Sequence, residues 1–204
     1  MRGSPHKNAA WPHFFMERKT ERRPEVKAET KARLKEPQRK SKKLGGLRSR
    51  FYMRYWLLKS EPSSYSIDDM ARDRTTAWNG VRNFQARNFM RDQMRVRDRA
   101  FFYHSNCEEP GIVGIVEVCG PAHADETQFD RKSKYYDPDA ERGAPRWLNV
   151  DVKFVKKTRL VALDELRRHK PLARMRILQR GNRLSITPLD PDEWKFIMRL
   201  LDDK

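Results

Sequence analysis

The composition of the chain changes sharply near residue 53, and this break sets how much of the chain can fold as one unit. Residues 1–52 carry 16 Lys and Arg against 5 Asp and Glu, so they hold +11 of the chain's net charge of +17. Four prolines and few aliphatic side chains accompany these charges. Such a segment buries too little apolar surface to offset the entropy lost on ordering. We therefore predict a disordered basic tail over 1–52 and one folded domain over 53–204.

The basic tail has two interpretations. It can be an arm that binds phosphates without sequence preference, and its hold would then weaken with added salt. It can also lack a dedicated role, in which case Met53, which stands directly before the first predicted strand, is the natural start of the protein. Either way the net charge favours polyanionic partners, with nucleic acid ahead of a membrane surface.

Beyond the break, runs of strand length alternate with short helical patterns. Strands are predicted at 55–59, 99–104, 112–118, 147–155 and 184–186. Helices are predicted at 66–70, 83–94, 163–169 and 191–201. Because no long repeat of strand, helix and strand is present, the pattern favours an α+β fold. We expect a mixed β-barrel of about five to six strands with short flanking helices, not a doubly wound sheet.

The two cysteines and the hydropathy of the chain exclude several classes of protein. Cys107 and Cys119 lack the paired spacing of a zinc site and are too few for a disulfide scaffold, so we expect two reduced thiols and no metal. No apolar run approaches the ~20 residues that span a bilayer, and no signal peptide precedes the domain. We expect a soluble protein without membrane contact, in the cytoplasm of a bacterium, which we favour, or in the nucleus of a eukaryote.

Six blocks of the sequence resemble the EVE domain family. They are YWLLKSEP (Tyr55–Pro62), WNGVRNFQARNFM (Trp78–Met90), FFYHSNCEEPGIVGIVEV (Phe101–Val118), YYDP (Tyr135–Pro138), RWLNVDVKF (Arg146–Phe154) and RLSITPL (Arg183–Leu189). The blocks stand in the family's order from about Tyr55 to Leu201. The resemblance implies a PUA-like barrel related to the YTH domains that bind methylated adenine. It also implies an intracellular binder of modified bases, especially modified cytosines in DNA, without a metal or cofactor.

A protein that inspects the chemistry of a base must first take the base out of the stack. Aromatic faces then hold the base at ~1–3 kcal/mol each, and fixed donors and acceptors reject analogues. Trp78 is our candidate for one wall, because it follows the polar stretch 72–76 and because YTH domains carry a cage aromatic at the equivalent place. Trp147 is the second candidate, since it follows Pro145 on the polar face of a predicted strand. Core packing stays the alternative for both rings.

The NGVRN segment after the first tryptophan combines turn residues with polar tips. Gly80 lets the backbone approach a ligand closely. Asn79 or Asn83 can present a donor and an acceptor to a base edge, although Asn83 is also well placed to cap the following helix. Arg82 is a candidate phosphate or base contact, with a plain surface position as the alternative, and Val81 completes the segment.

Residues at strand ends complete the predicted pocket, since ligand sites are common at the mouth of a barrel. They are Lys59 and Ser60 after the first strand, Tyr103, His104 and Ser105 after another, and Ser185 in a late strand. For His104 we favour an orienting hydrogen bond over acid–base catalysis, because no nucleophile or metal partner is near it in the sequence.

Two other functions stay open. Other PUA-like barrels include small amidohydrolases, and Lys59, Glu61 and His104 could serve such a hydrolase of modified nucleosides in the same cavity. The chain has none of the common hydrolase, metalloprotease or P-loop motifs. A basic adaptor fits the charge but leaves the pocket blocks unexplained. We therefore predict a non-enzymatic nucleic-acid-binding module that holds a flipped, modified base, with DNA favoured over RNA and no cofactor.

Overall fold

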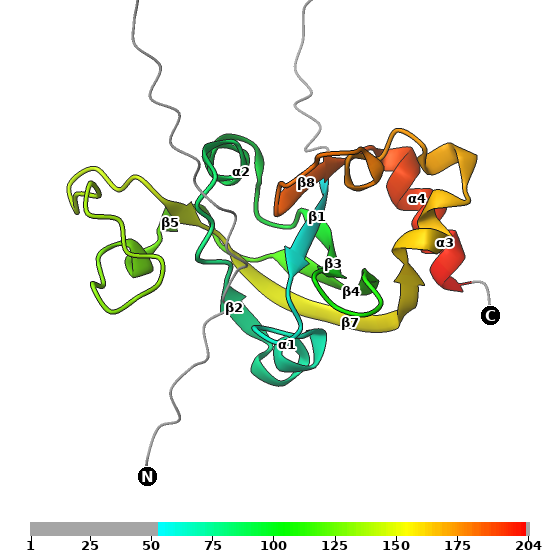
Figure 1. Cartoon of the computed structure of the whole chain (residues 1–204), viewed down its shortest axis with the longest axis horizontal. Helices are drawn as coiled ribbons and strands as arrows, with labels where there is room; N and C mark the ends of the chain where they lie inside the picture. The colour runs from blue at the N-terminus through cyan, green and yellow to red at the C-terminus, as the bar shows by residue number, and fades with distance from the viewer. Residues whose placement is uncertain (1–52, 203–204) are drawn as a thin grey trace, which may run out of the picture. The chain divides into compact units, whose positions relative to one another are not determined.

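The computed structural model describes residues 53–202, so the predictions for the basic tail lie outside the described residues. A six-stranded mixed sheet forms the centre of the domain (Figure 1), in the order β2-β7-β4-β3-β1-β8. Its strands are β1 (Tyr55–Ser60), β2 (Thr75–Ala77), β3 (Arg99–His104), β4 (Gly111–Val118), β7 (Asp151–Ala162) and β8 (Ile186–Leu189). The short strands β5 (His123–Ala124) and β6 (Leu148–Asn149) pair with each other.

The sheet confirms the predicted α+β fold. β1 and β3 are parallel, and each of the other neighbouring pairs is antiparallel. The sheet is bent at two register shifts in β4, between Ile112 and Gly114 and between Ile115 and Val116. A Cβ on Gly114 would collide with the Ile67 side chain, so glycine allows the helix above to pack closely. β2 and β8 form the two edges of the sheet and are not hydrogen-bonded to each other. The sheet is therefore an open, curved PUA-like sheet.

Two helices begin at the caps that the sequence indicates. α1 (Ile67–Asp73) starts with a reciprocal capping box between Ser66 and Asp69. α2 (Phe84–Asn88) starts at Asn83, whose side chain accepts the backbone N–H of Gln85 and Ala86. The single helix predicted over 83–94 instead passes into a π-helical turn, η1 (Phe89–Gln93), where the N–H of Met94 donates to the carbonyl of Phe89.

The remaining helices lie at the end of the domain opposite β5 (Figure 1). They are α3 (Leu163–Arg167), α4 (Pro191–Asp202) and the 3₁₀ turns η3 (Lys170–Leu172) and η4 (Arg176–Leu178), while a further 3₁₀ turn, η2 (Glu126–Gln128), follows β5. Trp194 on α4 stacks between Tyr55, at a centroid distance of 4.5 Å, and Phe101, at 4.1 Å. Within residues 53–202, no helix is both long and apolar enough to cross a bilayer.

Alternation along the strands separates two cores, one on each face of the sheet. Trp56 and Leu58 of β1 face the first core, which also contains buried residues of α1, α2 and η1. Leu57, between them, faces the second core, which contains Phe101 of β3 and buried residues of α3 and α4. Any side chain at the end of β1 or β3 therefore joins one face or the other according to its position along the strand.

Candidate nucleic-acid interface

A cavity of about 420 Å³ opens where the end of β2 meets β5 and β6. Its lining residues are Ala77, Asn79, His123, Ala124, Asp125, Glu126, Thr127 and Asn149. The volume lies within the range of small-ligand sites, roughly 300–1,000 Å³. Among the twelve site residues predicted from the sequence, Asn79 is the one that lines this cavity.

Two amide groups in the cavity wall carry oxygen atoms without a partner. The side chains of Asn79 and Asn149 are 5% and 3% exposed, and neither Oδ1 atom accepts a hydrogen bond from another described residue. Buried side-chain acceptors are normally paired, because leaving one unpaired costs about 1–3 kcal/mol. Both oxygens are therefore unsatisfied acceptors beside the cavity, and each must be uncovered before it can accept from the N–H or O–H groups of a ligand.

Asp125 fixes the loop that carries Asn79. The Asp125 carboxylate is fully buried and accepts the backbone N–H of Gly80 at 2.8 Å and of Thr127 at 2.9 Å. Gly80 has a φ of 76°, a backbone conformation that glycine adopts without strain. The turn after Asn79 is therefore held by a buried negative charge from a segment more than forty residues away in the chain.

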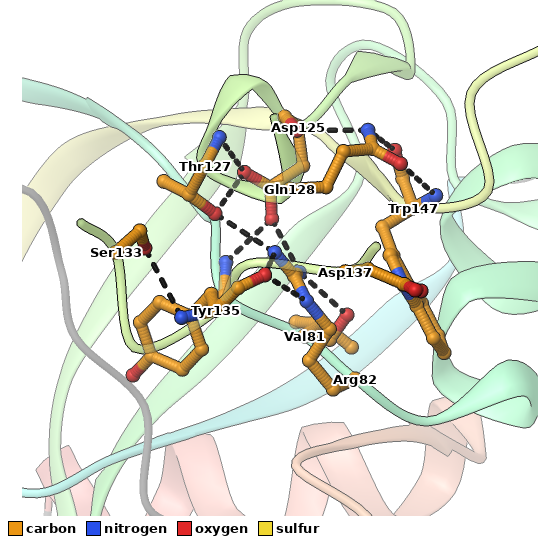
Figure 2. A network of polar contacts seen from close by, with 10 residues as sticks. Val81, Arg82, Asp125, Thr127, Gln128, Ser133, Tyr135, Asp137 and Trp147 are labelled. Carbon is orange, nitrogen blue, oxygen red and sulfur yellow. Dashed lines mark hydrogen bonds and ion pairs between the residues drawn. The ribbon is translucent and has the colours of Figure 1, made fainter. Parts of the chain in front are cut away.

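Arg82 is the counter-ion of this carboxylate (Figure 2). Its Nη1 lies 2.7 Å from Asp125 Oδ2, Nη2 donates to Thr127 Oγ1 at 2.9 Å, and Nε donates to the carbonyl of Tyr135 at 2.9 Å. These internal partners occupy the guanidinium, so Arg82 connects the turn after Asn79 to the loop after β5, and its contact with a phosphate or base stays a prediction. Val81, beside it, packs into the first core.

Trp147 belongs to the same network (Figure 2). Its backbone N–H donates to Gln128 Oε1 at 2.9 Å, and its Nε1 donates to Asp137 at 2.6 Å. The indole stacks on Phe84 with ring centroids 4.8 Å apart and is 2% exposed. The predicted position on an open polar face is thus wrong, because the loop after β5 covers this tryptophan. Its contact with a base stays a prediction that would require the ring to become uncovered.

Trp78 enters the first core directly before Asn79. The ring is fully buried and stands edge-on to Phe102, with centroids 5.5 Å apart. Its backbone N–H donates to the carbonyl of Val150 at 2.8 Å, which ties the end of β2 to the chain between β6 and β7. The stacking role predicted for Trp78 also stays a prediction, since neither ring face is open in this structure.

The remaining NGVRN residue, Asn83, has the structural role that the sequence left open. Its Oδ1 accepts the first free N–H groups of α2, at 2.9 and 3.1 Å, and the side chain lies at the surface. Asn83 therefore caps α2, the alternative that the sequence offered, and its contact with a base stays a prediction.

The sheet divides the predicted strand-end residues between its two faces. Ser60 and His104 lie on the first-core face, where Ser60 Oγ donates to the carbonyl of Tyr65 at 2.6 Å. His104 Nε2 accepts the backbone N–H of Ile67 at 3.1 Å, the orienting bond that the sequence favoured, and burial lowers the pKa of His104. Ser105 continues the strand pairing through a 2.8 Å bond from its N–H to the carbonyl of Ser60.

Lys59 and Tyr103 lie on the opposite, second-core face. Tyr103 is buried there, and desolvation raises its pKa to about 12. Lys59 is 7% exposed, its ammonium has no ion-pair or hydrogen-bond partner among residues 53–202, and burial lowers its pKa to about 8. The backbone N–H of Lys59 donates to the carbonyl of Ser185 at 2.8 Å, so these two residues are cross-strand neighbours. Lys59 and Tyr103 thus lie on the other face of the sheet from Ser60 and His104, and their contact with a base stays a prediction.

Comparison with known proteins identifies the family. The EVE domain model matches residues 54–200. The chain belongs to the EVE domain family. Thymocyte nuclear protein 1 of Gallus gallus is 44% identical over 180 residues, which cover 78% of this chain and 74% of that protein.

Two solved structures show how widely this EVE domain fold occurs. A hypothetical protein from Leishmania major is 43% identical, with a TM-score of 0.71, and the match covers 74% of this chain and 96% of that chain. The human THYN1 protein, crystallised in complex with 5-methylcytosine-containing DNA, is 41% identical, with a TM-score of 0.69 and coverage of 74% and 99%.

Sequence reasoning missed three residues that shape the cavity of this EVE domain. Asp125, Gln128 and Asn149 are all buried polar residues between β5 and the start of β7. Gln128 joins the segments, since its amide donates to the carbonyls of Asp125 and Trp147. No periodicity marks Asp125 and Gln128, whereas Asn149 stands in the alternating strand predicted over 147–155 and in the block Arg146–Phe154, a signal that could have found it. Within residues 53–202, no cluster of His, Cys, Asp and Glu is arranged to hold a metal ion.

Proposed function

We propose that the protein binds DNA and accommodates a flipped 5-methylcytosine in the cavity beside Asn79 and Asn149. The observation that carries the proposal is the pair of buried, unpartnered amide oxygens in a domain of the same family as a protein crystallised with 5-methylcytosine-containing DNA. Trp78 stays part of the proposal as the predicted stacking partner, since it directly precedes Asn79.

The chemistry of the cavity suits cytosine better than thymine. Cytosine carries an exocyclic amino group with two N–H donors, whereas thymine presents a carbonyl oxygen at that position. An amide oxygen accepts from the amino group but is repelled by the carbonyl, and a wrong pairing leaves a buried group unpaired. The two bases 5-methylcytosine and thymine share the methyl group, so the edge beside it separates them: cytosine has an amino group and the acceptor N3, whereas thymine has a carbonyl and an N3–H donor.

We propose a binding role without catalysis. The groups that a hydrolase would recruit are otherwise engaged: Glu61 accepts the side-chain amide of Asn106 at 2.9 Å, and His104 accepts a backbone N–H. Lys59 lies on the other face of the sheet from His104. These positions do not form a joint acid–base site.

Several vertebrate relatives bear the name thymocyte nuclear protein 1. In a eukaryotic cell we place the protein in the nucleus, where it would meet genomic DNA. This agrees with the second of the two locations expected from the sequence.

The test uses three DNA duplexes that differ at one position, which holds 5-methylcytosine, cytosine or thymine paired with the appropriate base. We expect the wild-type chain to prefer 5-methylcytosine. Asn79→Leu and Asn149→Leu should each reduce the preference over thymine by about tenfold or more, since a good base contact contributes ~1–3 kcal/mol of discrimination. Both variants should fold, because removing an unpaired buried acceptor does not break a bond.

Asn88→Leu is the matched control, because Asn88 ends α2 outside the cavity lining. It should leave the preference unchanged. If both cavity variants keep the wild-type preference, the base binds elsewhere. If the wild-type chain does not distinguish the three duplexes, the function itself is wrong.

A further inference from the structure

The chain between α3 and β8 carries an unusual concentration of positive charge. Residues 167–183, which we name the basic segment, contain six Arg and one Lys. No Asp or Glu occurs between Glu165 and Asp190. All seven cationic side chains are exposed. A stretch of this kind concentrates positive potential on one part of the surface.

Several arginines elsewhere on the domain surface have a carboxylate partner, whereas those in the centre of the basic segment do not. Arg72, Arg91 and Arg142 each lie within 3.0 Å of an acidic side chain. By contrast, the guanidinium groups of four residues of the basic segment make no hydrogen bond or ion pair with another described residue. These four are Arg174, Arg176, Arg180 and Arg183.

The basic segment is held in place by its own uncharged side chains. Gln179 Nε2 donates to the carbonyl of Ala173 at 2.8 Å, and Asn182 Nδ2 donates to the carbonyl of Arg176 at 2.8 Å. Leu172 and Met175 are fully buried in the second core. The fold thus presents four unpaired guanidinium groups from ten consecutive residues that contain no carboxylate, a concentration of charge that favours an anionic partner.

A second, independent observation points to the same face of the sheet. Lys59 lies on the second-core face, which Leu172 and Met175 of the basic segment also cover. This lysine is more than nine-tenths buried and has no counter-ion among the described residues. Its backbone is bonded to Ser185, two residues after the segment ends. Lys59 and the centre of the basic segment are thus two cationic features on one side of the sheet without a carboxylate partner among residues 53–202.

We infer that the basic segment is a preformed surface for the sugar–phosphate backbone of the nucleic acid. The inference rests on the proposed function and adds a backbone contact away from the flipped base, because the basic segment begins at the end of the domain opposite β5 and the cavity (Figure 1). Arginine is the side chain best suited to phosphate, because its planar guanidinium donates two parallel hydrogen bonds. A membrane surface is a poorer partner, since such segments expose large apolar side chains, whereas the apolar residues of this segment are turned into the core.

The test is the salt dependence of DNA binding by the full chain, with the triple variant Arg176→Gln, Arg180→Gln and Arg183→Gln. For duplex DNA, log K falls with log salt concentration by about 0.9 for each phosphate contact. We expect the triple variant to lose up to about 2.7 of that slope and to bind about tenfold or more weakly at physiological salt. The loss should be equal for duplexes with 5-methylcytosine and with thymine, because phosphate contacts carry no base information.

The matched control removes the same charge from paired arginines: Arg72→Gln, Arg91→Gln and Arg142→Gln. This control variant should change the salt slope by less than about 0.9, the value for one phosphate contact. Equal slopes for the two triple variants would overturn the inference, since net charge alone would then explain the effect. The inference also fails if the first triple variant binds phosphatidylserine vesicles more weakly but DNA as tightly as wild type. The wild-type preference among the three duplexes is measured separately, so a failure of the proposed function is recognised independently.

Discussion

The variant Lys59→Met replaces a buried ammonium by an unbranched apolar side chain of similar length. Lys59 is 7% exposed and has no ion-pair partner among residues 53–202, so the charge is desolvated without compensation. Desolvation lowers the pKa of Lys59 from 10.5 to about 8. In the unfolded chain the amine holds its proton up to the higher value, so between pH 8 and pH 10.5 the unfolded state binds more protons than the folded state.

The sign and size of the effect follow from this difference. The unfavourable contribution of Lys59 to stability shrinks as pH rises between the two pKa values, and below pH 8 its full penalty is present. Each pH unit between them corresponds to about 1.4 kcal/mol, so the penalty near pH 7 is about 3 kcal/mol. We expect Lys59→Met to be more stable than wild type by about that amount near pH 7, with a gain that vanishes toward pH 10.5.

Urea unfolding followed by tryptophan fluorescence measures the difference near pH 7 and near pH 10. Lys157→Met is the control, because Lys157 is half-exposed in an ion pair with Asp68 and should change stability by less than about 1 kcal/mol. A packing defect in Lys59→Met would shift both measurements equally, so the pH dependence isolates the charge. A stability difference that stays constant between the two pH values would refute the argument that this ammonium is buried without a partner.

Three further predictions concern the candidate site, two side chains that hold the fold around it, and the basic tail. Burial lowers the pKa of His104 below 6.5, so the unfolded chain takes up that proton at a higher pH than the folded chain does. The stability should therefore fall as pH drops through 6.5. The variant His104→Asn should reduce this fall in a series of thermal-unfolding measurements. Trp147→Phe removes the bond to Asp137 and should cost about 1.5–3 kcal/mol in urea unfolding while sparing the preference for 5-methylcytosine; a lost preference at unchanged stability would return Trp147 to the pocket. Deletion of residues 1–52 should lower DNA affinity and its salt slope in titrations, whereas disappearance of the base preference would contradict the cavity model.

Local rules were sufficient wherever neighbouring residues decide the structure. The capping box of Ser66 and Asp69 and the strand Arg99–His104 are observed as predicted. Helix spacing placed Trp194 and Ile197 in the buried stripe of α4. The helix 83–94 was wrong in its second half, because an i to i+5 bond at Phe89 depends on packing against the core and not on the residues of that turn alone.

The cavity residues show the limit of such rules. Asn79 and Asn149 both stand in blocks that resemble the EVE family, but Asn79 alone was selected, because it follows a candidate aromatic wall, whereas Asn149 is one polar residue of an alternating strand seventy positions later. Arg82 seemed free in the sequence because its partners Asp125 and Tyr135 follow more than forty residues later. The sequence alone does not show that a charged side chain is already paired when its partner lies far away along the chain.

What the sequence by itself determined is the family, the α+β class with its main strands, and the class of partner favoured by a basic chain. It also supplied the residues from which a base pocket would be built. The tertiary structure alone decided which of these residues lie on each face of the sheet. Strand alternation is local, but the face that each position joins depends on which helices pack there, and this set Lys59 apart from Ser60 and His104. The same folding left Asn79 and Asn149 unpaired together in one cavity, because only long-range contacts determine which buried polar groups find partners.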